Sequence, residues 1–378
     1  MILTYFKIGE RYGHNVSSYF SFMLLILGVN VILALIQLGN YIPYLATQRQ
    51  TSISIDTIMF TSSYNGTNIL IWRITNGVAI CVSYVIPILY ILVAKIETIW
   101  NAIVENEEQD LISRVVHDCR TKVLRYFLSY LAFSIVLVVS IVLNGVISMV
   151  ASYPSLIDTI VKATKINPMV IYSIASFASS IAIYVINMIW DKVNKIVSRY
   201  ELHTRWSIYR NHSIFKIVLF RLLNAWIVMV MKLAFNMSCM IDQMGIQTLS
   251  ITVLDLVLYN IVELILPVMA TLFYKWRGWH LDFDEFNVGE EYYEIVYRQF
   301  IMYIGMASCP LLPVIVSIAT IIEIVIDYVK LRWLTSAPTK ENVNVYMIAM
   351  SLTMAATAAI ANPVGGTLAI LINRHGCT

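Results

Sequence analysis

The chain has 378 residues, of which 59% are apolar and 13% are charged, about half the charged share of a typical soluble domain. Its mean hydropathy of +0.73 is too high for a globule that keeps its apolar surface out of water. The formal net charge of +3 is too small to indicate a nucleic-acid partner, so composition predicts an integral membrane protein with no nucleic-acid partner.

Apolar runs of about 20 residues recur along the chain, and each is long enough to cross a hydrocarbon core of roughly 30 Å. We expect about nine spans, at 18–46, 72–99, 124–152, 168–194, 214–237, 248–274, 295–311, 313–332 and 343–373. Backbone groups in lipid must be bonded within their own segment, so these spans are helices rather than the short alternating strands of a barrel. The predicted fold class is all-α, polytopic and integral to the membrane. Neither a repeat nor a linker divides it, so a single domain over 1–378 is expected.

Basic residues predict the orientation, because cytoplasmic loops retain lysine and arginine. The connections between the second and third runs and between the fourth and fifth are the most basic, which places both loops and the amino terminus in the cytoplasm. Asn65, in an Asn-Gly-Thr sequon, then lies outside and is the best-placed glycosylation site. The expected location is the plasma membrane. The sequence leaves open whether Cys239 and Cys377 form a disulfide or remain unpaired thiols, and Cys309 is expected to be unpaired.

Ionisable residues inside the predicted spans are the strongest functional signal, because a charge at a helix centre costs about 2.5–3.5 kcal/mol. Asp255, Tyr259 and Glu263 are spaced by four in the 248–274 run, which places them on one helix face. A polar stripe follows the 168–194 run at every third or fourth position, and the two runs at 295–311 and 313–332 add further polar groups. These residues are Ser173, Ser176, Ser180, Tyr184 and Asn187, then Gln299 and Tyr303, then Glu323 and Asp327.

Two interpretations of these faces stay open. The stripe of hydroxyl groups fits close helix packing and a water-lined surface equally well. Lys232 lies at a depth similar to that of Asp255, so the two could form an ion pair. The acidic face favours a conduit, because Glu263 has no basic residue at its depth, and a row of carboxylates attracts cations and repels anions.

Prolines mark two special places. Pro310 and Pro313 predict a tight outer turn that joins two consecutive helices as a hairpin. Pro267 lies in the middle of the 248–274 run, where an ordinary kink and a gating hinge are both consistent with the sequence.

The sequence shows no enzyme signature: HExxH, a P-loop and a GxGxxG after a strand are all missing, and no cofactor or metal site is expected. The stretch "DFDEFNVGEEYY" at 282–293 superficially resembles a calcium loop. It fails where Asn287 replaces the required glycine and where Tyr293 replaces the bidentate glutamate. We therefore expect a solvated, acidic, amphipathic segment leading into the next span.

Two segments resemble the transmembrane channel-like (TMC) family, whose fold is related to that of the anoctamins and the OSCA channels. "YRQFIMYIGMASCPLLPVI" at 297–315 is similar to the family's signature, and "SCMIDQMGIQTLSITVLDLV" at 238–257 is similar to the segment that opens its sixth span. The specific part of the resemblance covers about 239–335. Asp255 falls on the family's pore-lining acid, and the signature falls on Gln299, Gly305, Pro310, Leu311, Leu312 and Pro313.

The resemblance implies a ten-helix, anoctamin-like architecture with an ion path inside each protomer, lined by spans 4 to 8. It implies a mechanically gated channel for monovalent cations and calcium. The alternatives are a lipid scramblase of the same superfamily and a non-conducting receptor or accessory subunit. It also implies a calmodulin-like calcium sensor at the loop 100–123. The chain ends where relatives continue into the helix of their dimer contact, so dimerisation stays open.

Overall fold

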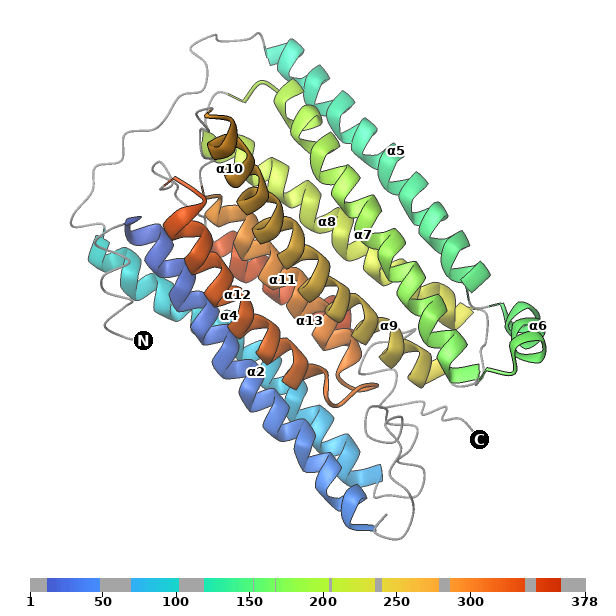
Figure 1. The fold of residues 1–378 in the computed structure, drawn as a ribbon. Helices are drawn as coiled ribbons and strands as arrows, with labels where there is room; N and C mark the ends of the chain where they lie inside the picture. Colours follow the sequence, from blue (N-terminus) through green and yellow to red (C-terminus); the bar gives the residue numbers. More distant parts are fainter. Residues whose placement is uncertain are drawn as a thin grey trace.

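The computed structural model describes residues 12–47, 69–101, 119–151, 153–166, 168–203, 206–234, 240–278, 286–336 and 345–361. Most of these residues are helical and none lies in a β-strand, which confirms the all-α fold class. In chain order the helices are α2 (His14–Thr47), α4 (Ile69–Asn101), α5 (Cys119–Ala151), α6 (Pro154–Thr164), α7 (Pro168–Tyr200), α8 (Trp206–Ala234), α9 (Met240–Leu254), the π-helical turns η2 (Asp255–Tyr259) and η3 (Ile261–Ile265), α10 (Leu266–Arg277), α11 (Val288–Gly305), α12 (Leu312–Trp333) and α13 (Val345–Ala361) (Figure 1).

Each predicted span corresponds to one of these helices or, for the sixth, to the continuous run from α9 to α10. Segments of α2, α4, α5, α7 and α12 are long and apolar enough to cross a membrane by length and composition. α9 and α13 contribute shorter apolar stretches. α11 does not reach this standard because it carries Glu290, Glu291, Glu294 and Arg298. The chain is thus a polytopic integral membrane protein, and α11 is one of its strongly polar helices.

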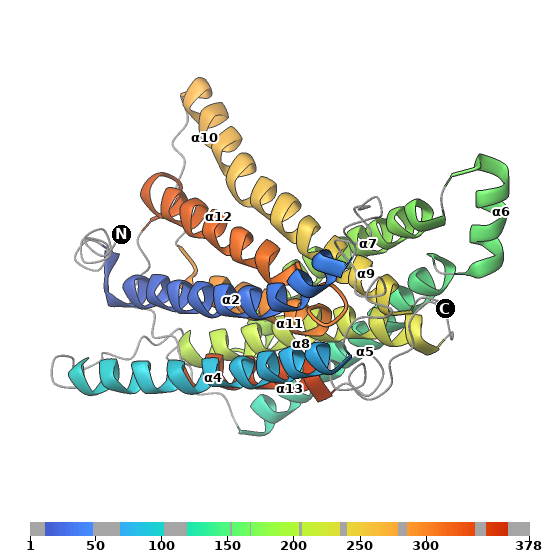
Figure 2. The ribbon, with the colours of Figure 1, turned by 90° about the horizontal axis from the view of Figure 1, so that it is seen from below.

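That polar helix, α11, lies at the centre of the bundle (Figures 1 and 2). It packs against α2, α12 and α13 on one side and against α8 and α9 on the other, while α5 and α7 lie further out. Every residue of α11 except Glu290 is buried. Tyr292 illustrates the packing, since its ring centroid lies 5.2 Å from that of Tyr19 and 4.9 Å from that of Phe22.

The predicted solvated segment before the seventh span is wrong for its second half. Asn287 caps α11 by accepting a hydrogen bond from the Glu290 backbone N–H, so the helix already begins at Val288. The first two turns are covered by α2 and α12, and Glu291 is 6% exposed. An acidic pattern indicates solvent only when no neighbouring helix supplies a counter-charge, and here α12 supplies Lys330.

The sixth span is interrupted by the two π turns, which the sequence did not predict. Two local features coincide with these turns. The Asn260 side chain donates a hydrogen bond to the backbone carbonyl of Leu256, and Pro267, in the first turn of α10, has no backbone N–H to donate. π turns are rare and occur frequently at functional sites. After them α10 leaves the bundle (Figure 2), and none of its residues is buried. Pro267 therefore lies directly after the π turns, and a kink or hinge at this residue stays a prediction.

The predicted hairpin turn is confirmed. α11 ends at Gly305, whose carbonyl accepts from the Cys309 N–H at 2.8 Å, and the Leu312 N–H donates to the Cys309 carbonyl at 3.0 Å. Pro313 occupies the first turn of α12, and Cys309 is buried and unpaired, as expected. Gly305 is required by close approach, because an added Cβ would overlap Thr248 of α9 and lie 2.5 Å from Cδ2 of Leu312.

The short helix α6, between α5 and α7, was not predicted either. It starts with Pro154 in its first turn and ends at Lys165, which adopts a left-handed conformation with φ 57°. α6 lies at the edge of the bundle (Figures 1 and 2).

Candidate functional site

A cavity of about 290 Å³ lies between α7, α8, the run from the end of α9 through the π turns, and α11. It brings together four of the residues that the sequence singled out, namely Ser180, Tyr184 and Asn187 of α7 and Asp255 of η2. Six further charged residues line it: Asp191, Lys192, Lys195, Arg221, Glu290 and Glu294. The cavity therefore has a hydroxyl and amide wall on α7 and charged groups of both signs.

The α7 stripe takes part in helix packing and in the cavity wall at the same time. The Ser180 hydroxyl accepts a hydrogen bond from the side-chain amide of Gln247 of α9 at 2.8 Å. The side-chain amide oxygen of Asn187 accepts one from the side-chain amide of Asn224 of α8 at 3.1 Å. The two interpretations of the stripe thus do not exclude each other, because one side chain can bridge two helices and still border the cavity.

Four other predicted residues do not line the cavity. Ser173 and Ser176 lie earlier along α7, and the Ser176 carbonyl accepts from the Ser180 hydroxyl at 2.9 Å. Gln299 and Tyr303 lie on α11 with 0% and 1% exposure. Their place along a conducting path stays a prediction.

Several predictions concern residues outside the described part of the structure. These are the side chains of Tyr259, Glu263 and Lys232, together with Asn65, Cys239, Cys377 and most of the loop 100–123. The predicted row of carboxylates is therefore described at Asp255 alone.

Asp255 is paired with an arginine that the sequence analysis did not connect to it. Its Oδ2 atom accepts from Nε of Arg298 at 3.1 Å. The Asp255 side chain is 19% exposed and lines the cavity, whereas the Arg298 side chain is 5% exposed and does not. The acidic end of this pair faces the cavity and the basic end is sealed behind it.

Arg221 makes the second charged contact of the wall. Its guanidinium lies 2.6 Å from Oδ2 of Asp191 and 3.5 Å from Oε1 of Glu294, and all three residues line the cavity. This part of the cavity wall thus carries both positive and negative charge, whereas the sequence led us to expect a purely acidic face.

Asp255 lies at the edge of a group of acidic side chains whose other members are buried. We call this group the carboxylate cluster and define it as Asp255, Glu291, Glu294, Glu323 and Asp327. Arg298 contacts Glu323 as well as Asp255, and Lys330 lies 2.7 Å from Glu291 and 3.6 Å from Asp327. The Tyr19 hydroxyl donates to Asp327 at 2.6 Å. Glu323 and Asp327 are 3% and 0% exposed, so the expectation that acids at membrane depth face water is wrong for these two.

The carboxylate cluster keeps an excess of negative charge. Its five carboxylates are contacted by three cations, Arg221, Arg298 and Lys330. Oε2 of Glu291 and Oε1 of Glu323 are buried and have no hydrogen-bond partner within the described residues. Buried unpaired charge is costly, so the cluster favours an additional cation or proton. The spacings 291/294 and 323/327 place each pair of acids on one helix face. Glu323 and Asp327 were singled out from the sequence, but the 291/294 spacing, which was the available signal for this cluster, was not used.

Membrane-spanning helices around a polar central helix, with a charged cavity between four segments, define a membrane protein of the channel or lipid-transport class. A family profile described as "Anoctamin: Calcium-activated chloride channel" matches residues 8–362. The chain therefore belongs to the anoctamin family, which implies ion conduction or lipid scrambling. The TMC resemblance is thereby confirmed at the level of the superfamily. No curated protein matches the chain.

The family description names calcium, and the carboxylate cluster provides a test of whether the residues fit it. Glu291, Glu294 and Glu323 each offer an oxygen atom, and these atoms lie within 4.8 Å of one another. Calcium takes about six to eight oxygen ligands, mostly carboxylates and carbonyls. The donor set and the excess negative charge fit a divalent cation, although Arg298 and Lys330 contact the same carboxylates.

Proposed function

We propose that this chain is a subunit of a cation-permeable channel whose ions pass along the cavity between α7, α8, the π turns and α11. The observation that carries the proposal is the Asp255–Arg298 pair, in which the carboxylate faces the cavity and the guanidinium does not. A fixed negative charge in a cavity with low-dielectric walls raises the local concentration of cations. Hydroxyl and amide groups of Ser180, Tyr184 and Asn187 can replace part of the water around a passing ion.

Cation preference needs its own argument, because the matched family description names chloride. The TMC resemblance around Asp255 supports cations. Lys192, Lys195 and Arg221 also line the cavity and would favour anions. The balance between Asp255 and these cations is therefore the quantity to measure.

The decisive experiment compares Asp255→Asn with Asp255→Glu in cells that express the chain. Reversal potentials in a sodium chloride gradient give the sodium-to-chloride permeability ratio. We expect Asp255→Asn to lower this ratio several-fold and Asp255→Glu to keep it, because only the first variant removes the charge. An unchanged ratio in Asp255→Asn would remove the role given to this carboxylate, and a chloride-selective wild type would overturn the cation assignment.

We propose that Glu291, Glu294 and Glu323 hold calcium. The bound ion would supply positive charge that neutralises carboxylates on α11 and α12. Glu323→Gln should raise the calcium concentration needed for half-maximal current and should weaken the stabilisation of the purified protein by calcium. Glu290→Gln is the matched control, because Glu290 lines the cavity and is not a member of the carboxylate cluster. Equal calcium responses in Glu323→Gln and the wild type would exclude this site.

A lipid scramblase is the second candidate. It is favoured by α10, which has no buried residue and follows the cavity wall at Val262, with Leu266 and Met269 58% and 59% exposed. Lys192, Lys195 and Arg221 could accompany a phosphate headgroup along such a wall. Liposomes with fluorescent lipids separate the two functions: lipid transfer without ion flux supports scrambling, and ion flux without lipid transfer supports the channel.

The TMC resemblance supports further proposals: gating by membrane tension, movement of the α11–α12 hairpin during gating, permeation of monovalent cations and calcium, and a plasma-membrane location with a cytoplasmic amino terminus. Pressure steps on excised patches test the gating. Loss of a glycosidase-sensitive mass shift in Asn65→Gln tests the orientation, because only an Asn65 on the outer side can be glycosylated.

A further inference from the structure

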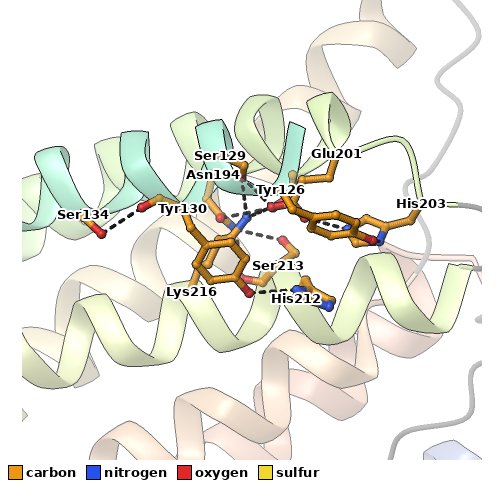
Figure 3. A network of polar contacts seen from close by, with 11 residues as sticks. Tyr126, Ser129, Tyr130, Ser134, Asn194, Glu201, His203, His212, Ser213 and Lys216 are labelled. Atoms are coloured by element: carbon orange, nitrogen blue, oxygen red, sulfur yellow. Dashed lines mark hydrogen bonds and ion pairs between the residues drawn. The ribbon is translucent and has the colours of Figure 1, made fainter. Parts of the chain in front are cut away.

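A second cluster of polar side chains lies where the end of α7 meets α5 and α8 (Figure 3), and none of its members lines the cavity or belongs to the carboxylate cluster. Three elements build it: α5 contributes Tyr126, Ser129 and Tyr130, the segment after α7 contributes Glu201 and His203, and α8 contributes His212 and Lys216. We call it the histidine cluster.

The foundation of the histidine cluster is a buried ion pair. Lys216 donates to Oε1 of Glu201 and, at 2.9 Å, to the Ser129 hydroxyl, and both charged side chains are 0% exposed. The Ser129 hydroxyl donates to the same Oε1 at 2.5 Å. Burial opposes ionisation of Glu201, but hydrogen bonds from His203, Lys216 and Ser129 outweigh it and lower the pKa of Glu201 to about 2. The carboxylate is thus ionised, and its second oxygen is directed toward His203.

The two histidines are held in the same way. Nδ1 of His203 lies 2.8 Å from the Tyr126 hydroxyl, and Nδ1 of His212 lies 2.8 Å from the Tyr130 hydroxyl. The tyrosines are one turn apart on α5, and the two imidazole rings lie 5.0 Å apart. In both histidines the tyrosine contacts Nδ1, so Nε2 is the ring nitrogen that can make other contacts. Nε2 of His203 lies 2.6 Å from Oε2 of Glu201.

We propose that Glu201, His203 and His212 form a binding site for a transition-metal ion, with Zn²⁺ as the best chemical match. One ligand atom from each residue lies within 4.8 Å of the others. Two imidazoles and one carboxylate form a three-ligand set that binds Zn²⁺ and leaves a fourth position for water. Nitrogen donors select against calcium, which prefers oxygen.

The surroundings match what such a site requires. A metal-binding histidine commonly engages its second ring nitrogen in a hydrogen bond that orients the ring, and Tyr126 and Tyr130 provide that bond.

The site would tie α8 to α5 and to the end of α7. On α8, Ile214, Ile217 and Val218 follow His212 within two turns and line the cavity. An ion in the histidine cluster would thus restrain one wall of the cavity. This regulatory consequence rests on the proposed channel function, whereas the metal site itself does not.

The test uses the full chain, purified in detergent through a tag without histidine. Co²⁺ is titrated while its visible absorption is followed, and Zn²⁺ affinity is obtained by competition, with elemental analysis for stoichiometry. We expect one ion per chain. His203→Gln and His212→Gln should each weaken binding at least tenfold, and Tyr130→Phe should weaken it about 10- to 100-fold through loss of the orienting hydrogen bond.

A control makes the result specific. Tyr153→Phe changes a 54% exposed tyrosine at the start of α6 and should bind Zn²⁺ like the wild type. The histidine variants are preferred over Glu201→Gln, which would leave Lys216 buried without its carboxylate. Wild-type affinity in both histidine variants, or no binding by the wild type, would overturn the site. Because binding is measured without currents, this failure is distinct from failure of the channel proposal.

Discussion

Two helices near the same cavity are held in opposite ways. α11 is buried along its whole length except at Glu290, although it carries four charged residues, whereas α10 has no buried residue and is largely apolar. In a soluble protein this relation would be reversed. Here lipid accommodates an apolar helix, while a polar helix must be enclosed by other helices that satisfy its charges. Burial in these two helices therefore follows polarity. We expect α10 to be held less firmly by its neighbours than α11.

The largest effect is expected at Arg298, which joins α11 to η2 through Asp255 and to α12 through Glu323. Arg298→Gln leaves buried carboxylates without their cation, which costs about 3–5 kcal/mol. The apparent free energy of unfolding in detergent measures this loss. Arg277→Gln on α10 is the matched control and should change stability by less than about 0.5 kcal/mol, because Arg277 is exposed. Equal effects of the two variants would contradict the comparison.

A smaller loss is expected at Gly305, where α11 crosses α9. The new methyl group of Gly305→Ala would overlap Thr248 and Leu312, and overpacking of this kind costs about 1–3 kcal/mol. Gly77→Ala on α4 is the control, because no atom lies within 4 Å of the added Cβ. A helix gains up to about 1 kcal/mol from such a change. Thermal unfolding of both variants should therefore shift in opposite directions.

Pro267→Ala tests the mobility of the sixth span. The substitution restores an N–H group beside the π turns, so a regular α-helical hydrogen bond can form. We expect a clear shift in the stimulus that activates the current, with a change in unfolding free energy smaller than that of Gly305→Ala. Patch recordings and unfolding in detergent measure the two quantities. A large loss of stability without a shift in activation would indicate a purely structural role for this proline.

The smallest effects are expected from conservative changes of methionine. Met269 on α10 is 59% exposed and Met302 on α11 is 0% exposed. Met269→Leu should change stability by less than about 0.5 kcal/mol, and Met302→Leu should cost up to about 1.5 kcal/mol, because only the second side chain is surrounded by protein. Thermal unfolding of the two variants is the measurement. A larger loss for Met269→Leu would show that α10 is packed in the native protein.

Local patterns account for what could be predicted. The apolar runs predicted the helices because hydropathy and length are properties of each segment alone. Pro310 and Pro313 predicted the hairpin turn, since proline removes a donor wherever it stands. Asp255 was identified because an acid within an apolar run is costly in any arrangement. The π turns at Asp255–Tyr259 and Ile261–Ile265 were missed, because the hydropathy of these residues is that of an ordinary apolar α-helix.

Hydropathy and composition were enough to predict an all-α membrane protein, its long apolar helices and charged residues at membrane depth, but not α6 or the π turns. Only the tertiary structure decided which charges meet. It placed Arg298 between Asp255 and Glu323, buried the acidic start of α11 beside Lys330, and joined Glu201 to His203 and Lys216. The physical reason is range: helix formation in lipid depends on the backbone of one segment, whereas the pairing of buried charges depends on neighbouring helices that the linear order does not reveal.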